Sequence, residues 1–129
     1  MSEMSDAQVT VAELRRLVAD FVAARDWRQF HTPKNLAMAL AIEAAELMEH
    51  FQWLDAGESQ DVAEDPTKRA AAGEELADVL CYALAMADAL GLDVSRAMHA
   101  KMEKNVRKYP ADEYRGRWGA EDARMPRQD

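Results

Sequence analysis

Apolar residues recur every three or four positions along four stretches of the chain, which is the spacing of amphipathic α-helices. The first stretch opens on Thr10 and Glu13, a residue pair typical of the capping box that starts a helix. The second opens at Pro33, which follows a threonine suited to the N-cap, and its pattern extends to Trp53 or Leu54. These signals predict two helices in the first half of the chain.

Two further helices are predicted in the second half. Residues 55–65 are acidic and lack periodicity, so we expect a loop there. A long helix is expected from Pro66 to Leu90, with Gly91 as the residue that ends it. The last apolar pattern follows directly and is stopped by Pro110.

The pattern as a whole predicts an all-α fold, a four-helix bundle. Glycine (5) and proline (4) are few among the 129 residues, which favours helices over a loop-rich structure. A chain of this length forms one domain. We expect that domain to span residues 1–110, with a frayed N-terminus over 1–9, and residues 111–129 to form a C-terminal tail.

Charge and cysteine content narrow the possible partners. The net charge of −8 argues against binding of a nucleic acid polymer, although a small phosphorylated ligand remains possible where a metal reverses the local charge. The single cysteine, Cys81, excludes an internal disulfide and a zinc cluster and suits the cytoplasm. No apolar run has membrane-spanning length, and no signal-peptide pattern opens the chain, so we expect no membrane partner.

Two pairs of carboxylates are the strongest chemical signal. Glu43 and Glu46 are three residues apart in the second predicted helix, and Glu75 and Asp78 repeat this spacing in the third. Apolar residues surround both pairs, and no lysine or arginine follows four positions later. Carboxylates in such surroundings repel each other unless a cation lies between them.

A divalent metal site is therefore predicted from these four carboxylates. All-oxygen ligands favour Mg²⁺, with Mn²⁺ as a substitute. A di-iron centre would need Glu-x-x-His pairs, which the chain lacks. The competing interpretation is an ordinary solvated helix surface, and we expect Glu49 and His50 to lie on such a flank.

Aromatic residues near the predicted metal helices suit a flat ligand. Trp27 and His31 lie in the loop next to the start of the first of these helices. Trp53 lies more than one turn beyond Glu46, and Tyr82 lies one turn beyond Asp78. Such side chains could stack on a nucleobase, and packing in the protein core is an equally open interpretation.

The last predicted helix carries basic residues toward its end. Lys101 and Asn105 are four residues apart and share one face. Together with a metal they could hold a phosphate chain, whereas basic residues at a helix end often only compensate the helix dipole. The chain has no glycine-rich phosphate loop.

Several motifs, in order along the chain, resemble one known family. They are RDWRQFHTPKN, the Glu43-x-x-Glu46 pair, FQW, EELADVLCY and KMEKNVRKYP. In this set the chain resembles the MazG-like, all-α nucleoside triphosphate pyrophosphatase superfamily, and its dCTP pyrophosphatase branch in particular. The resemblance covers about residues 14–110.

The resemblance implies an activity and a site. Members cleave a nucleoside triphosphate between the α- and β-phosphates, which yields a monophosphate and pyrophosphate, and they assemble as homodimers or homotetramers. By position, the family's Mg²⁺ ligands correspond to Glu43, Glu46, Glu75 and Asp78; its base and sugar contacts to Trp27, His31, Trp53 and Tyr82; and its phosphate contacts to Lys101 and Asn105.

Some features stay open at this level. The branch often has a histidine where Val18 stands here, which removes one contact that the resemblance implies for the base. The resemblance implies dCTP or a modified dCTP as the substrate, and another base such as that of dUTP is an alternative. Glu46 or Glu74 is the candidate for the residue that accepts the proton of the attacking water. A non-catalytic helical interaction module is the rival from another class.

Overall fold

The computed structural model describes residues 4–117, which form six α-helices and two short 3₁₀ helices and contain no strand. The all-α prediction is confirmed. The chain divides into two compact units, Met1–Leu92 and Asp93–Asp129, each described here by itself. The prediction of one domain over residues 1–110 stays a prediction.

The first helix, α1 (Val11–Ala24), begins where the capping box was expected. Thr10 Oγ1 accepts a hydrogen bond from the Glu13 backbone N–H at 3.1 Å, and the Thr10 N–H donates to Glu13 Oε2 at 2.6 Å. Residues 5–9 form a hydrogen-bonded turn before it, and residues 1–3 of the predicted frayed segment lie outside the described residues. A 3₁₀ helix, η2 (Arg28–Phe30), follows α1.

The second helix, α2 (Pro33–Glu49), starts as predicted and ends earlier than predicted. Thr32 caps it by accepting from the Asn35 N–H at 3.3 Å. The expected extension to Trp53 or Leu54 is wrong. The N–H groups of Phe51 and Leu54 donate to carbonyls three residues back, so the chain continues there as turns.

The acidic stretch predicted as a loop is largely helical. It contains α3 (Ala56–Asp61) and η3 (Val62–Glu64). Asp55 and Glu58 form a second capping box, with a 2.8 Å bond from the Glu58 N–H to Asp55 Oδ1. This local signal starts a helix that is too short to show an apolar period.

The longest helix, α4 (Pro66–Leu90), has the predicted ends. Asp65 Oδ1 accepts from the N–H groups of Thr67 and Lys68, and Gly91 ends the helix with a left-handed φ of 64°. These ends place the second carboxylate pair near the middle of α4.

The second unit holds α5 (Val94–Lys108), which Asp93 caps, and α6 (Ala111–Tyr114). The predicted tail is therefore partly helical, and residues 118–129 of it lie outside the described residues. The short helices α3 and α6 bring the number of α-helices to six instead of the four expected.

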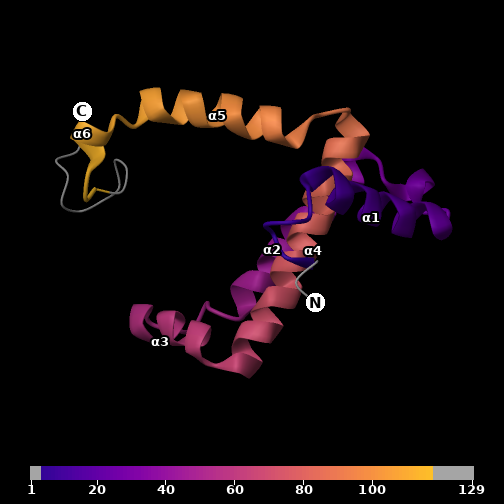
Figure 1. Ribbon diagram of the computed structural model, residues 1–129. Helices are drawn as coiled ribbons and strands as arrows, with labels where there is room; N and C mark the ends of the chain where they lie inside the picture. The colour runs from indigo at the N-terminus through magenta and orange to yellow at the C-terminus, as the bar shows by residue number, and fades with distance from the viewer. Residues whose placement is uncertain (1–3, 118–129) are drawn as a thin grey trace. The chain divides into compact units, whose positions relative to one another are not determined.

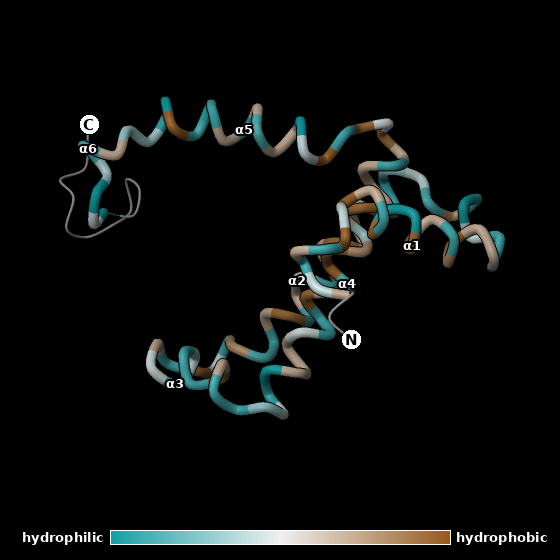
Figure 2. Tube along the Cα trace, viewed as in Figure 1, coloured by the Kyte–Doolittle hydropathy of each residue, from teal (hydrophilic) through white to brown (hydrophobic). Residues whose placement is uncertain are grey.

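The first unit is built on α2 and α4, which run antiparallel in extensive contact (Figure 1), while α1 packs on α4. Apolar positions recur along both α2 and α4 between polar ones (Figure 2). The buried apolar residues are Val22, Leu36, Val62, Ala85 and Ala87. None of the helices within residues 4–117 has the length and apolar composition of a membrane span.

Candidate functional site

Three carboxylates from the paired helices meet in one cluster. Oxygen atoms of Glu43 on α2 and of Glu75 and Asp78 on α4 all lie within 4.8 Å of one another. The antiparallel packing produces this arrangement, because it sets the Glu43 turn of α2 opposite the Glu75–Asp78 turn of α4. Glu43 and Glu75 are half-buried, whereas Asp78 is exposed.

The cluster is electrostatically unfavourable by itself. Burial, followed by the proximity of the Glu46 carboxyl group and the charge of Asp78, raises the pKa of Glu43 above its ordinary 4.5. Burial and then Glu46 and Asp78 raise the pKa of Glu75 in the same way. The Glu46 carboxyl group therefore lies near both residues, although it is not one of the three whose oxygens come within 4.8 Å of one another, and its role as a metal ligand stays a prediction.

The two half-buried acids each leave one oxygen unsatisfied. Glu43 Oε2 and Glu75 Oε2 are inaccessible to solvent, and no donor among residues 4–117 forms a hydrogen bond with either. Buried oxygens without a donor are costly, and a hard divalent cation offsets that cost by accepting them as ligands. The donor set and its orphaned oxygens thus fit a divalent cation such as Mg²⁺.

Two neighbours of the cluster differ from expectation. Glu74 is exposed and is not among the carboxylates that come together. His50 was expected on a solvated flank, but its Nε2 lies 3.9 Å from Glu75 Oε1 and lowers the Glu75 pKa against the other influences. No spacing in the sequence signalled this contact, because His50 lies at the end of α2 and Glu75 lies on α4.

An aromatic cavity of about 370 Å³ adjoins the carboxylates. Its lining includes Trp27, His31 and Tyr82 together with Asp78 of the cluster. The His31 and Tyr82 rings have centroids 6.5 Å apart. Cys81 also lines it, and burial with the nearby Asp78 charge raises the pKa of that thiol. Three of the four aromatic residues singled out in the sequence thus share one cavity that reaches a metal-site carboxylate.

The fourth, Trp53, is not brought to this cavity. It is 86% exposed and lies in the turn after α2. Because α2 ends at Glu49, the helical spacing that related Trp53 to Glu46 does not hold. Any role of Trp53 in base binding stays a prediction.

Lys101 and Asn105 lie on α5, in the second unit. Lys101 is exposed and Asn105 is half-buried, with its Nδ2 at 3.7 Å from Met102 Sδ. Their spacing of four on one helix is confirmed, and their role with phosphates stays a prediction.

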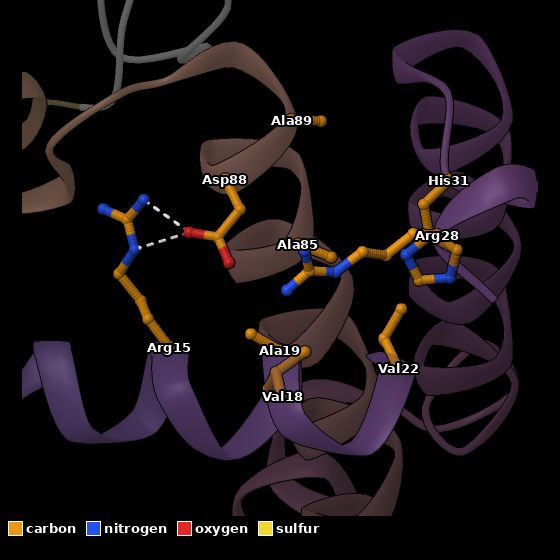
Figure 3. A pocket seen from close by; sticks show the side chains of 9 residues that line it. All are labelled: Arg15, Val18, Ala19, Val22, Arg28, His31, Ala85, Asp88 and Ala89. Atoms are coloured by element: carbon orange, nitrogen blue, oxygen red, sulfur yellow. Dashed lines mark hydrogen bonds and ion pairs between the residues drawn. The ribbon is translucent and has the colours of Figure 1, made fainter. Parts of the chain in front are cut away.

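A second cavity, of about 410 Å³, was not anticipated (Figure 3). Its charged lining residues are Arg15, Arg28 and Asp88, and His31 also lines it. Asp88 is ten residues after Asp78, so on a regular helix it lies about 80° around the axis from Asp78 and farther still from Glu75. The spacing of the carboxylates therefore gave no signal for this cavity.

Known proteins match most of this chain. A family model described as the MazG-like family matches residues 38–119. A dCTP pyrophosphatase 1 from Rattus norvegicus is 47% identical over 107 residues, which cover 83% of this chain and 63% of the rat protein. The one from Homo sapiens is 48% identical over 102 residues, covering 79% and 60% respectively. The chain thus spans less than two thirds of the length of these relatives.

A solved structure agrees with the fold. The crystal structure of a pyrophosphatase from Archaeoglobus fulgidus matches with a TM-score of 0.71 and 43% sequence identity. The match covers 77% of this chain and 91% of the other.

Proposed function

The chain belongs to the MazG-like family, and from this premise we propose that it is a nucleoside triphosphate pyrophosphohydrolase. It would cleave its substrate between the α- and β-phosphates and release a nucleoside monophosphate and pyrophosphate. The observation that carries this proposal is the continuity of the carboxylate cluster with the aromatic cavity, which Asp78 joins.

The carboxylates would hold a divalent cation, with Mg²⁺ expected and Mn²⁺ as a substitute. Glu43, Glu75 and Asp78 would supply oxygen ligands, and Glu46 would lie beside them. When bound, such a cation supplies positive charge that offsets the charge of the phosphates and favours ionisation of a water.

Glu46 is the residue that we propose accepts the proton of the attacking water. The support is that its carboxyl group neighbours both Glu43 and Glu75, which would hold the cation. Glu74, the earlier alternative, is exposed and has less support.

Base and phosphate contacts complete the proposed site. Trp27, His31 and Tyr82 would enclose the base and sugar, since all line the aromatic cavity. Lys101 and Asn105 are proposed phosphate contacts on the basis of the family resemblance. Trp53 is proposed to contact a base only within a homodimer or homotetramer.

For the substrate we propose dCTP or a modified dCTP. The proposed role of the reaction is house-cleaning of the nucleotide pool. The support is the name of the mammalian relatives, dCTP pyrophosphatase 1. The cytoplasm is the proposed location.

The test is pyrophosphate release from the common nucleoside triphosphates and from 5-modified dCTPs, with Mg²⁺ and with EDTA. Magnesium-dependent release, strongest with cytosine deoxynucleotides, is the expected result. Release from a different base would retain the reaction and change the substrate. No release from any nucleotide would contradict the proposal and favour a helical interaction module.

A further inference from the structure

The aromatic cavity and the second cavity adjoin each other, because four residues line both. Val18 and Val22 of α1, Ala85 of α4 and His31 line both of them. The shared α1 and α4 residues have small or medium-sized apolar side chains. A planar group bound between the aromatic residues would therefore have one edge toward the second cavity.

Residues along one side of α4 lead from the carboxylate cluster to the second cavity. Asp78 belongs to the carboxylate cluster, Tyr82 lines the aromatic cavity, Ala85 lines both cavities and Asp88 lines the second cavity. The ten residues from Asp78 to Asp88 correspond to about 15 Å along a helix. A nucleotide with its phosphates at Asp78 would thus extend its base along α4 toward Asp88.

Asp88 is held in place and keeps an unused acceptor. Arg15 donates to Asp88 Oδ1 from Nε at 3.0 Å and from Nη2 at 2.6 Å, and its Nη1 donates to the Leu92 carbonyl at 2.6 Å. Both bonds to Asp88 end on Oδ1, so Oδ2 remains available for a ligand in the described part of the chain. The Arg15 contacts fix the carboxylate in orientation.

Arg28 provides donors on the opposite wall. Its side chain extends across the cavity toward Asp88 (Figure 3), and among residues 4–117 no hydrogen bond or ion pair occupies it. The cavity therefore presents a fixed acceptor on one side and guanidinium donors on the other.

We propose that Asp88 and Arg28 recognise the edge of the substrate's base and favour cytosine over uracil. This inference rests on the proposed function. Cytosine offers its N4 amino group as a donor and N3 and O2 as acceptors, which complements Asp88 and Arg28. Uracil has a carbonyl oxygen in place of the amino group, and this oxygen would face the Asp88 carboxylate without a proton between them. An acceptor that a ligand covers with another acceptor loses its hydrogen bonds to water without replacement, which lowers the binding energy.

The experiment measures kcat/KM for dCTP and for dUTP in the full-length protein with Mg²⁺. The Asp88→Asn variant replaces part of the acceptor with an amide donor of the same shape. We expect it to lower the ratio of dCTP to dUTP by about tenfold or more. Calorimetric binding of dCMP and dUMP gives the same comparison without turnover.

Two further variants separate recognition from folding. Asp88→Asn weakens the pair with Arg15. Arg28→Gln breaks no hydrogen bond or ion pair within residues 4–117, so it provides an independent test, and we expect it also to lower the ratio of dCTP to dUTP. Asp20→Asn and Arg16→Gln are matched controls on α1 outside both cavities, and we expect both to keep the wild-type ratio.

The outcomes are distinct for the two proposals. A lowered ratio in both cavity variants supports the recognition of cytosine. Pyrophosphate release with a ratio that neither variant changes overturns this inference and leaves the proposed function in place. The absence of release from every nucleotide overturns both.

Discussion

Glu43 buries one carboxylate oxygen that no donor satisfies, beside three other acids. Replacing it with glutamine removes a repelling charge and a metal ligand together. We therefore expect Glu43→Gln to raise the melting temperature of the metal-free protein and to abolish the additional rise caused by Mg²⁺. Its pyrophosphate release should fall by about a hundredfold or more.

Glu49→Gln is the matched control for this substitution. Glu49 is exposed at the end of the same helix and lies outside the carboxylate cluster. The control should keep both the response to Mg²⁺ and the activity. A Glu43→Gln protein that Mg²⁺ stabilises as much as the wild type would contradict the metal site.

The raised pKa values also predict a pH dependence. Glu43 and Glu75 bind protons more tightly in the folded protein than at their ordinary pKa of 4.5 in the unfolded chain. Their contribution to stability is therefore complete below pH 4.5 and is lost as the pH rises through the raised values. In EDTA, the wild type should lose stability relative to Glu43→Gln across that range. Thermal melts with parallel pH profiles would argue against this linkage.

Also at the scale of single residues, the sequence predicted the neighbours of a side chain where these neighbours lie on regular helices. Glu43 and Asp78 could be assigned to one site because the residues around each of them follow a regular helical period. Trp53 could not, since the end of α2 at Glu49 depends on tight turns that the apolar pattern does not encode. Arg28 lies in a short 3₁₀ segment, where no period relates a side chain to a cavity.

At the scale of elements, the contribution of a helix end to stability can be tested at Gly91. Gly91 ends α4 with a φ of 64°, a conformation that costs an L-residue free energy. We expect Gly91→Ala to lower the free energy of unfolding by about 1 kcal/mol. Urea titration followed by circular dichroism would measure this change.

Gly73, inside α4, is the matched control. A Cβ there meets no atom within 4 Å, so Gly73→Ala should stabilise the protein through helix propensity, by up to about 1 kcal/mol. Equal effects of the two substitutions would mean that backbone conformation at Gly91 is not the cause.

The elements themselves were predictable where a cap residue adjoined an apolar period. Thr10, Pro33 and Gly91 fixed helix ends that the structure confirms. The helix α3 was missed although Asp55 and Glu58 form a capping box, because six residues are too few to show an apolar period.

At the scale of the whole molecule, apolar side chains exceed what one copy buries. Ile42 on α2 is 59% exposed and Leu80 on α4 is 54% exposed, while the buried core of the described residues is small. This surface supports the proposed assembly into a homodimer or homotetramer. We expect sedimentation velocity to show an oligomer at micromolar concentration and Ile42→Glu to shift it toward the monomer.

Gln8→Glu adds the same charge outside these two helices and should leave the sedimentation coefficient unchanged. A monomeric wild type would show that these apolar surfaces stay exposed in solution.

The row of residues along α4 has an evolutionary consequence. Asp78 and Asp88 are separated by about 15 Å of helix, beyond the range of about 7–10 Å within which substitutions usually influence each other. Changes at the two ends should therefore combine additively. Substitutions at the Asp88 end could therefore change the proposed base preference during evolution and leave the carboxylates of the proposed hydrolytic site unchanged.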